Sequence, residues 1–109
     1  MRKLFINANV VTIDKVLEKT NVLVENGVIT DFSTVNVCAD EVIDCQGNYL
    51  VAGFVDIHCH GGGGADFMDG SVEAMETAVR THLLHGTTTI YPTTMSAEMS
   101  EIENTFNIL

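Results

Sequence analysis

The sequence predicts a mixed α/β protein, with a small β-sheet or sandwich first and the start of a parallel α/β architecture after it. Residues 1 to about 51 hold short runs rich in Val, Ile and aromatic residues, separated by turn residues. From Gly53 onward, runs of strand length alternate with segments of helical periodicity. We therefore place a domain boundary between residues 1–52 and residues 53–109.

The first half contains three β segments, "KLFINANVV", "NVLVENGVITDF" and "EVIDCQGNYLV". Asn26-Gly27 predicts a hairpin within the second segment, because this pair readily adopts the two positive φ angles of a type I′ turn. Gln46-Gly47-Asn48 punctuates the third segment. We expect these strands to form a small antiparallel sheet or sandwich.

The second half reads as strand, helix, strand, helix. The run "GFVDIHCH" is apolar until its histidines, which is typical of a strand covered on both faces. A helix is expected over "SVEAMETAVRTHLLHG", with Ser71 as N-cap and Gly86 as the stop. "TTTIYP" is the next strand and "SAEMSEIENTFNIL" the next helix. The apolar positions at helical spacing are Val72, Met75, Val79 and Leu83, then Met99, Ile102, Phe106 and Leu109.

The last of these apolar stripes is unfinished at Leu109, with no glycine cap and no polar tail after it. Two parallel strands with two helices leave strand edges and apolar faces open. We therefore expect the N-terminal piece of a longer protein. The alternative is a complete small protein that covers these surfaces by oligomerising.

The composition excludes several classes of protein. Hydrophobic residues make up 46% and charged residues 18%, which is typical of a globular chain. Fifteen acidic against five basic residues give a net charge of −10, which argues against a nucleic-acid or anionic-membrane partner. Solubility alone explains this charge. No apolar run could span a bilayer, and the basic start lacks a signal-peptide cleavage site. Three cysteines without a CxxC pattern indicate reduced thiols in a cytoplasmic protein, namely Cys38, Cys45 and Cys59.

The stretch "DIHCHGGGG" contains the candidate metal ligands. Strand alternation predicts that Asp56, His58 and His60 share one face and that Cys59 faces a helix layer. Two imidazoles one pleat apart can both bind a single cation of the Zn or Fe type. The pattern His-x-His alone is a weak signal and is more typical of hydrogen-bonded polar residues. Its place at the end of an apolar strand favours a ligand, because buried polar groups without a partner are costly.

The residues around this pair have weaker roles. Four glycines follow it and permit unusual dihedrals and close backbone approach to a ligand, namely Gly61, Gly62, Gly63 and Gly64. We expect Asp66 to form a turn or contact substrate, and Asp69 to cap the next helix. His82 and His85 lie in the last turns of that helix, and we expect both to be structural or exposed. The remaining metal ligands and the general base are therefore expected beyond Leu109.

The segment "LVAGFVDIHCHGGGG" resembles the first barrel strand of the amidohydrolase superfamily, whose pattern is Pro-Gly-Phe-(Ile/Val)-Asp-x-His-x-His. "HGGGGADFMDG" followed by "HGTTTIYPTTM" is similar, more narrowly, to the N-acetylglucosamine-6-phosphate deacetylase family. The preceding β segments resemble the N-terminal strands of that family's small β-domain, so the resemblance covers essentially the whole chain. Ala52 departs from the usual proline, which removes a rigid turn but no chemistry.

This resemblance implies a small β-sandwich followed by the first βαβα units of a TIM-like metal-dependent hydrolase barrel. It implies hydrolysis of N-acetylglucosamine 6-phosphate, a phosphorylated amino sugar, to glucosamine 6-phosphate and acetate, and it implies a homodimer. His58 and His60 match the family's His-x-His positions, which bind a divalent metal in some members. Other members have lost this pair and hold one metal by a later Glu and two later His. A later aspartate would transfer the proton. Substrate-loop residues would be Gly61 to Gly64, Asp66, Thr93 and Thr94.

Two other interpretations remain open. Another amidohydrolase, such as a dihydroorotase or a hydantoinase, shares His-x-His but lacks the four-glycine loop with "ADFMDG". A non-catalytic β-rich assembly module would fold without any affinity for metal. Because the later ligands are absent, we expect the 109 residues by themselves not to deacetylate.

Overall fold

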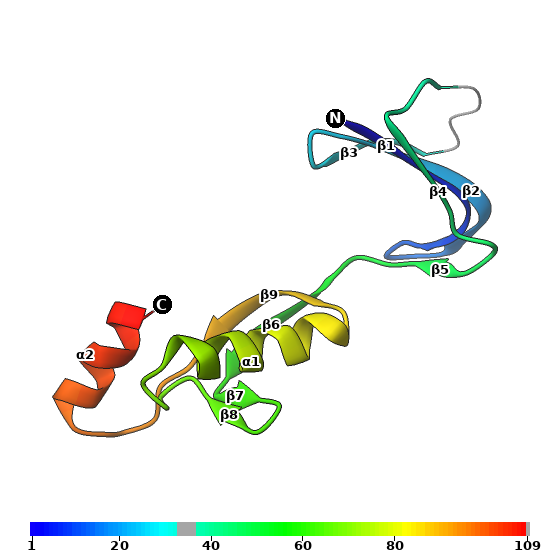
Figure 1. Ribbon diagram of the computed structural model, residues 1–109. Coiled ribbons are helices and arrows are strands. Elements are labelled where there is room, and N and C mark those ends of the chain that lie inside the picture. Colours follow the sequence, from blue (N-terminus) through cyan, green and yellow to red (C-terminus); the bar gives the residue numbers. More distant parts are fainter. Residues whose placement is uncertain (33–36, 109) are drawn as a thin grey trace. The chain divides into compact units, whose positions relative to one another are not determined.

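The computed structural model describes residues 1–32 and 37–108 (Figure 1). The chain forms two compact units, Met1–Ala52 and Gly53–Leu109. We call these unit 1 and unit 2. None of the described helices is both long and apolar enough to cross a bilayer.

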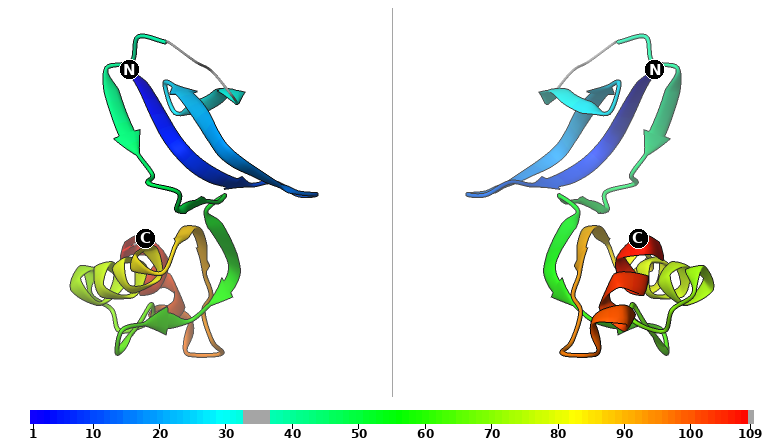
Figure 2. Two further views of the ribbon diagram at one scale, coloured as in Figure 1. Left: turned by 90° about the vertical axis from the view of Figure 1, so that its right-hand side faces the viewer. Right: turned by 90° about the vertical axis from the view of Figure 1, so that its left-hand side faces the viewer.

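Unit 1 is a five-stranded sheet with the order β3-β2-β1-β4, and β5 also pairs with β1. The strands are β1 (Arg2–Val11), β2 (Val16–Glu25), β3 (Val28–Phe32), β4 (Glu41–Asp44) and β5 (Tyr49–Leu50). Strands β1 to β3 are antiparallel, whereas β4 and β5 run parallel to β1. Figure 2 shows β4 beside β1, on the side away from β3.

The prediction of an antiparallel sheet was therefore wrong for β4 and β5. After β3 the chain does not continue beside β3 but returns to the far side of β1, and this return makes the new pairing parallel. This arrangement gives backbone carbonyls on the free edge of β1 their hydrogen-bond partners. Asp40 N donates to Arg2 O at 3.0 Å, and Cys45 N donates to Ile6 O at 2.8 Å. Local patterning identified the strands but not the partner of each strand.

The predicted hairpin is confirmed. Strands β2 and β3 pair antiparallel, and the turn residues Asn26 and Gly27 have φ of 51° and 83°. Two positive φ angles in succession are the signature of a type I′ turn, whose twist matches that of the flanking strands. An added Cβ at Gly27 would meet nothing within 4 Å, so this turn requires glycine for its dihedral and not for space.

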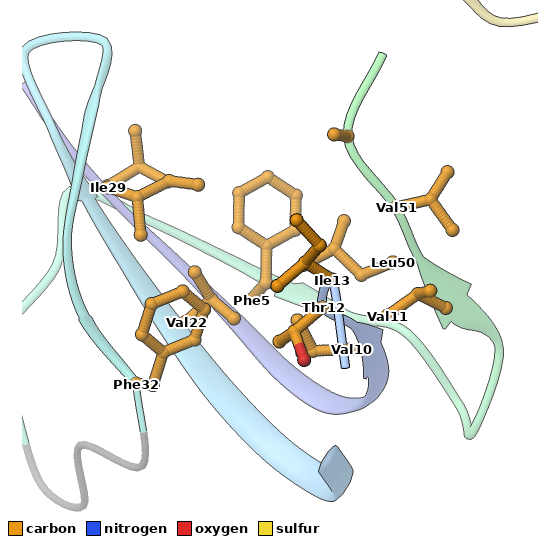
Figure 3. A pocket seen from close by; sticks show the side chains of 12 residues that line it. Phe5, Val10, Val11, Thr12, Ile13, Val22, Ile29, Phe32, Leu50 and Val51 are labelled. Atoms are coloured by element: carbon orange, nitrogen blue, oxygen red, sulfur yellow. The ribbon is translucent and has the colours of Figure 1, made fainter. Parts of the chain in front are cut away.

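The core of unit 1 is apolar throughout. Ala8, Val10 and Val22 are buried, and the side chains packed against them are Phe5, Leu17, Val24, Cys45 and Leu50. Beside this core lies a hollow of about 500 Å³ that is lined by apolar side chains including Phe5, Ile29 and Phe32 (Figure 3). Among the described residues, its lining contains no histidine or carboxylate. The histidines predicted as metal ligands lie in unit 2.

Unit 2 has the predicted order of strand, helix, strand, helix. Its elements are β6 (Phe54–Cys59), β7 (Gly61–Gly62), β8 (Ala65–Asp66), α1 (Val72–Leu84), β9 (Thr87–Pro92) and α2 (Met99–Ile108). The parallel pairing of β6 with β9 is confirmed. The caps of α1 are confirmed as well, because Ser71 Oγ accepts from Ala74 N at 3.1 Å and Gly86 has φ of 94° after the helix. Unpredicted is the short hairpin of β7 and β8.

The face that α1 buries differs from the predicted apolar stripe. Ala78 is fully buried and Met75 half-buried, whereas Val72, Val79 and Leu83 are exposed. The helix instead packs its small and polar side against the β7–β8 hairpin. An added Cβ at Gly62 would lie 2.9 Å from His82 Nε2, and one at Gly63 would overlap Thr81 Oγ1. Close approach of glycine backbone thus selects a small-residue face.

Strand β6 was predicted to be covered on both faces, and this was wrong for the described residues. Phe54, Val55 and Ile57 are exposed, with Ile57 at 76%. β6 pairs with β9 alone in a two-stranded sheet, so apolar side chains on it lack a packing partner. α2 shows the same departure, since Met99 and Phe106 on its predicted stripe are exposed while Thr105 is buried.

Candidate metal centre

The candidate site lies at the carboxyl end of β6 and in the hairpin that follows. The strand was predicted to continue through His60 but ends at Cys59. Its pairing with β9 is irregular here, because Asp56 lies opposite Ile90 and Cys59 lies opposite Pro92. Three steps along β6 thus match two steps along β9. Such an irregularity breaks the alternation of side chains between the two faces.

His58 and His60 lie together as predicted from their spacing. Their Nε2 atoms are 3.2 Å apart, and their ring centroids are 5.1 Å apart at an interplanar angle of 68°. Without a metal, this contact is a hydrogen bond in which one Nε2 carries a proton. His60 Nδ1 is buried and has no hydrogen-bond partner among the described residues.

The pair fits a shared metal ion. Zinc binds imidazole nitrogen at about 2.0–2.1 Å, so two nitrogens at tetrahedral positions lie roughly 3.3 Å apart. The observed 3.2 Å between the two Nε2 atoms is close to this separation. Metal-bound histidines usually donate the other ring N–H to a second group. The buried His60 Nδ1 is an atom that still requires such an acceptor.

Asp56 does not lie where strand alternation predicted it. One of its carboxylate oxygens, Cys59 Sγ and a ring nitrogen of His82 all lie within 4.8 Å of one another. The predicted separation of Asp56 from Cys59 was therefore wrong, and the irregular pairing after Asp56 accounts for it. Asp56 also contacts the histidine segment, because its Oδ1 accepts from His58 N at 3.1 Å.

The four glycines form a tight hairpin. Gly61 and Gly62 pair with Ala65 and Asp66, and the turn residues Gly63 and Gly64 have φ of 64° and 88°. The predicted unusual dihedrals are thus confirmed at these two turn residues. The close backbone approach is to the chain's own side chains, and contact with a ligand stays a prediction.

Asp66 and Asp69 form the turn after this hairpin. Asp66 Oδ1 accepts from Met68 N at 2.8 Å, which confirms the expected turn. Asp69 Oδ2 accepts from Asp66 N at 2.8 Å. The prediction that Asp69 caps the helix was wrong, because Ser71 occupies the cap position. The turn leads into Phe67, which is 1% exposed and packs with Cys59 and Ala78.

Thr93 joins the ends of the two parallel strands. Its amide donates to Cys59 O at 2.7 Å, and its Oγ1 accepts from Cys59 N at 3.2 Å. It therefore lies beside the segment that carries both histidines. Thr94 is half-buried. Carboxyl ends of neighbouring parallel strands are the usual position of functional groups in α/β folds.

His82 is a residue that sequence reasoning undervalued. Its Nε2 lies 3.0 Å from Gly61 O and 3.1 Å from Cys59 Sγ. His85, by contrast, is exposed as expected, with its Nδ1 2.7 Å from Thr81 O. The sequence did contain a pattern that could have identified His82. Ala74, Ala78 and His82 follow one another at steps of four, so they form one helix face of small residues that ends in a possible metal ligand.

The chain is similar in sequence and in structure to N-acetylglucosamine-6-phosphate deacetylases. A relative from Haemophilus influenzae, N-acetylglucosamine-6-phosphate deacetylase, is 40% identical over 70 residues, which cover 63% of this chain and 18% of the relative. The crystal structure of N-acetylglucosamine-6-phosphate deacetylase from Pasteurella multocida matches 99% of this chain and 29% of its own, with a TM-score of 0.85 and 32% identity. The predicted resemblance to these deacetylases is confirmed.

The similarity is partial, and it extends to a second kind of hydrolase. No family model matches the chain. A dihydroorotase from Geobacillus is 47% identical over 49 residues, which cover 43% of this chain and 12% of the relative. The chain spans about a fifth of the length of the curated deacetylase relative. The similarity therefore extends over only part of each deacetylase.

Proposed function

We propose that this chain is the N-terminal part of an N-acetylglucosamine-6-phosphate deacetylase, a hydrolase of the amidohydrolase superfamily that acts on a linear amide bond. The observation that carries the proposal is a structural match over 99% of the chain at a TM-score of 0.85 and 32% identity. Unit 1 would belong to a small β-sandwich and unit 2 to the start of a barrel. The substrate would be the phosphorylated amino sugar, and the setting a cytoplasmic homodimer.

In this proposal His58 and His60 hold a divalent metal through their Nε2 atoms, and the spacing of 3.2 Å supports it. When bound, zinc or iron supplies a Lewis acid that activates water and polarises the amide carbonyl. Asp56 positions the pair by accepting from His58 N. Thr93 fixes the end of β6 to the end of β9. The glycine hairpin and the Asp66 turn would border the substrate.

Two histidines do not complete a catalytic metal site, which usually has three protein ligands and one open position. The proposal therefore requires further ligands and a proton-transfer group outside the 109 residues. It also explains the exposed Phe54, Val55 and Ile57 on β6 as a surface that neighbouring barrel elements would cover. The 109 residues expressed by themselves are predicted not to release acetate from N-acetylglucosamine 6-phosphate.

The test is an acetate-release assay on the protein expressed from its whole reading frame. Substitution of both histidines, His58→Ala with His60→Ala, should lower bound metal and reduce kcat/KM by at least about 100-fold. That loss exceeds the 10- to 100-fold typical of residues that only support a ligand. His85→Ala is the matched control, since His85 is exposed and lies next to Gly86, whose carbonyl accepts from Phe54 N at the opposite end of β6 from the two histidines. Unchanged metal content in the double variant would refute the assigned ligands.

A dihydroorotase is the second candidate, because a 49-residue stretch is 47% identical to one. Both activities hydrolyse an amide bond, so the substrate decides between them. The same preparation should be assayed with dihydroorotate and with N-acetylglucosamine 6-phosphate at equal concentrations. Turnover of dihydroorotate alone would replace the deacetylase proposal and leave the assigned histidine ligands intact.

A further inference from the structure

A second group of metal-binding side chains lies beneath the glycine hairpin. Cys59 on β6, His82 on α1 and Asp56 on β6 each offer one ligand atom, and these atoms lie within 4.8 Å of one another. Cys59 is buried, whereas Asp56 and His82 are half-buried. Cys59 and His82 are 23 positions apart in the sequence and lie on different elements. The packing of α1 against the end of β6, and not local sequence, therefore brings the group together.

The spacing of the atoms fits a small cation. Cys59 Sγ and His82 Nε2 are 3.1 Å apart, and the Gly61 carbonyl oxygen lies 3.3 Å from the sulfur and 3.0 Å from the nitrogen. Zinc binds sulfur at about 2.3 Å and nitrogen or oxygen at about 2.0–2.2 Å, so tetrahedral neighbours lie roughly 3.3–3.6 Å apart. An outward movement of a few tenths of an ångström would convert this triangle into three positions of a zinc tetrahedron.

The kind of donor selects the kind of ion. A thiolate with an imidazole and a carboxylate suits zinc, whereas magnesium and calcium prefer oxygen ligands alone. His82 also lines a hollow of about 220 Å³ between α1 and β9. Asp56 completes the set, and its second contact, with His58 N, links it to the neighbouring histidine pair.

We infer that Cys59, His82 and Asp56 form a zinc-binding site separate from the His58–His60 pair. The ion would sit against the Gly61 carbonyl and tie α1 to the start of the glycine hairpin, one residue after His60. Its role is structural: it would fix the loop that borders the proposed catalytic metal. Because the two sites use different ligands, the metal bound at each site can be measured separately.

The test uses Co²⁺ as a spectroscopic probe and Zn²⁺ in competition with it, on the purified protein. Cobalt bound to a thiolate gives a near-ultraviolet charge-transfer absorption that cobalt bound by histidines alone lacks. The band should persist in a variant that keeps Cys59 as its one cysteine, made by Cys38→Ser with Cys45→Ser. It should also persist in His58→Ala with His60→Ala, which separates this site from the proposed catalytic pair.

Cys59→Ser should abolish the band, and His82→Gln should weaken zinc affinity at least about 10-fold, as losses around metal sites typically do. His85→Gln on the same helix is the matched control and should bind as the unaltered protein does. Circular dichroism establishes that each variant is folded. Absence of the band from the unaltered protein would overturn the inference and leave Cys59 and His82 as hydrogen-bonding partners of Gly61. An unchanged zinc affinity in folded His82→Gln would overturn it as well.

Discussion

The hairpin of β2 and β3 and the hairpin of β7 and β8 have the same kind of turn in different surroundings. Both turns have two consecutive residues with positive φ, Asn26-Gly27 in unit 1 and Gly63-Gly64 in unit 2. Added Cβ atoms at Gly27 and at Gly64 would meet nothing within 4 Å, whereas one at Gly63 would overlap Thr81 Oγ1. Glycine is thus required for its dihedral in the first hairpin, and for dihedral and space in the second.

The two hairpins are stabilised by different contacts. The first is held by long strands, since β2 has 10 residues and its partner β3 has 5. The second has strands of only 2 residues. It depends on tertiary contacts with α1 and on the buried Phe67 that follows it. A change beneath the second hairpin should therefore cost more than the equivalent change at the first.

The largest effect is expected from removing the core side chain beneath the second hairpin. Phe67→Ala should lower the free energy of unfolding of unit 2 by about 3–5 kcal/mol, because Phe67 is 1% exposed and its removal leaves a cavity. Phe32→Ala, at the end of the first hairpin, is the matched control. Phe32 is 41% exposed, so a smaller loss is expected. Hydrogen exchange resolved by residue would measure both, and equal losses would contradict the comparison.

The next effect comes from the turns themselves. Gly63→Ala should cost about 3 kcal/mol, since left-handed strain of about 1–2 kcal/mol adds to overpacking of about 1–3 kcal/mol. Gly27→Ala should cost the strain alone, because the space around it is open. Adding Thr81→Ala to Gly63→Ala should recover part of the loss by removing the overlapping hydroxyl. Urea denaturation measures all three, and no recovery in the double variant would refute the steric explanation.

A smaller effect is expected at the start of the helix that supports the second hairpin. Ser71→Ala removes the acceptor of Ala74 N and should cost about 1 kcal/mol. Ser100→Ala, at the second residue of α2, is the control, and a smaller loss is expected, because Ser100 lies inside the first turn and does not occupy the N-cap position. Thermal unfolding followed by circular dichroism compares the two. A loss at Ser100 equal to that at Ser71 would contradict the capping role.

The smallest effect concerns a third turn with two positive φ angles, Gln46-Gly47 in unit 1, which Asp44 holds. The Asn7 side-chain amide donates to Asp44 Oδ1 at 2.9 Å, and together with the Gln46 amide it lowers the pKa of Asp44 below 3.8. Because this pKa is depressed in the folded state, the stabilisation is present above pH 3.8 and is lost as the pH falls through the lowered value.

Asn7→Ala should raise the pKa of Asp44 toward 3.8, measured by NMR titration of its carboxyl group. Asn9→Ala is the control, since the Asn9 side chain donates to Gly47 O and not to Asp44. The pKa of Asp44 should stay lowered in that variant. An Asp44 that titrates at its ordinary value in the unaltered protein would refute this account of the turn.

Much of the site could be predicted from local pattern. The spacing of His58 and His60 placed their side chains together, and their Nε2 atoms lie 3.2 Å apart. Ser71 and Gly86 marked the limits of α1, because caps depend on a few adjacent residues. The motifs around them also predicted the similarity to the deacetylases. The position of Asp56 could not be predicted, because the irregular pairing of β6 with β9 is not encoded in either strand by itself.

The sequence by itself determined the longer strands, the two helices, the hairpin turn at Asn26-Gly27 and the proximity of the two histidines, since each depends on dihedral preference or on spacing within one element. The tertiary structure decided that β4 and β5 pair in parallel with β1, which face of α1 is buried and that His82 meets Cys59. These outcomes depend on the approach of elements distant in sequence. The glycines of the β7–β8 hairpin allow α1 to come so close that a face of alanine, threonine and histidine packs in place of the more apolar one.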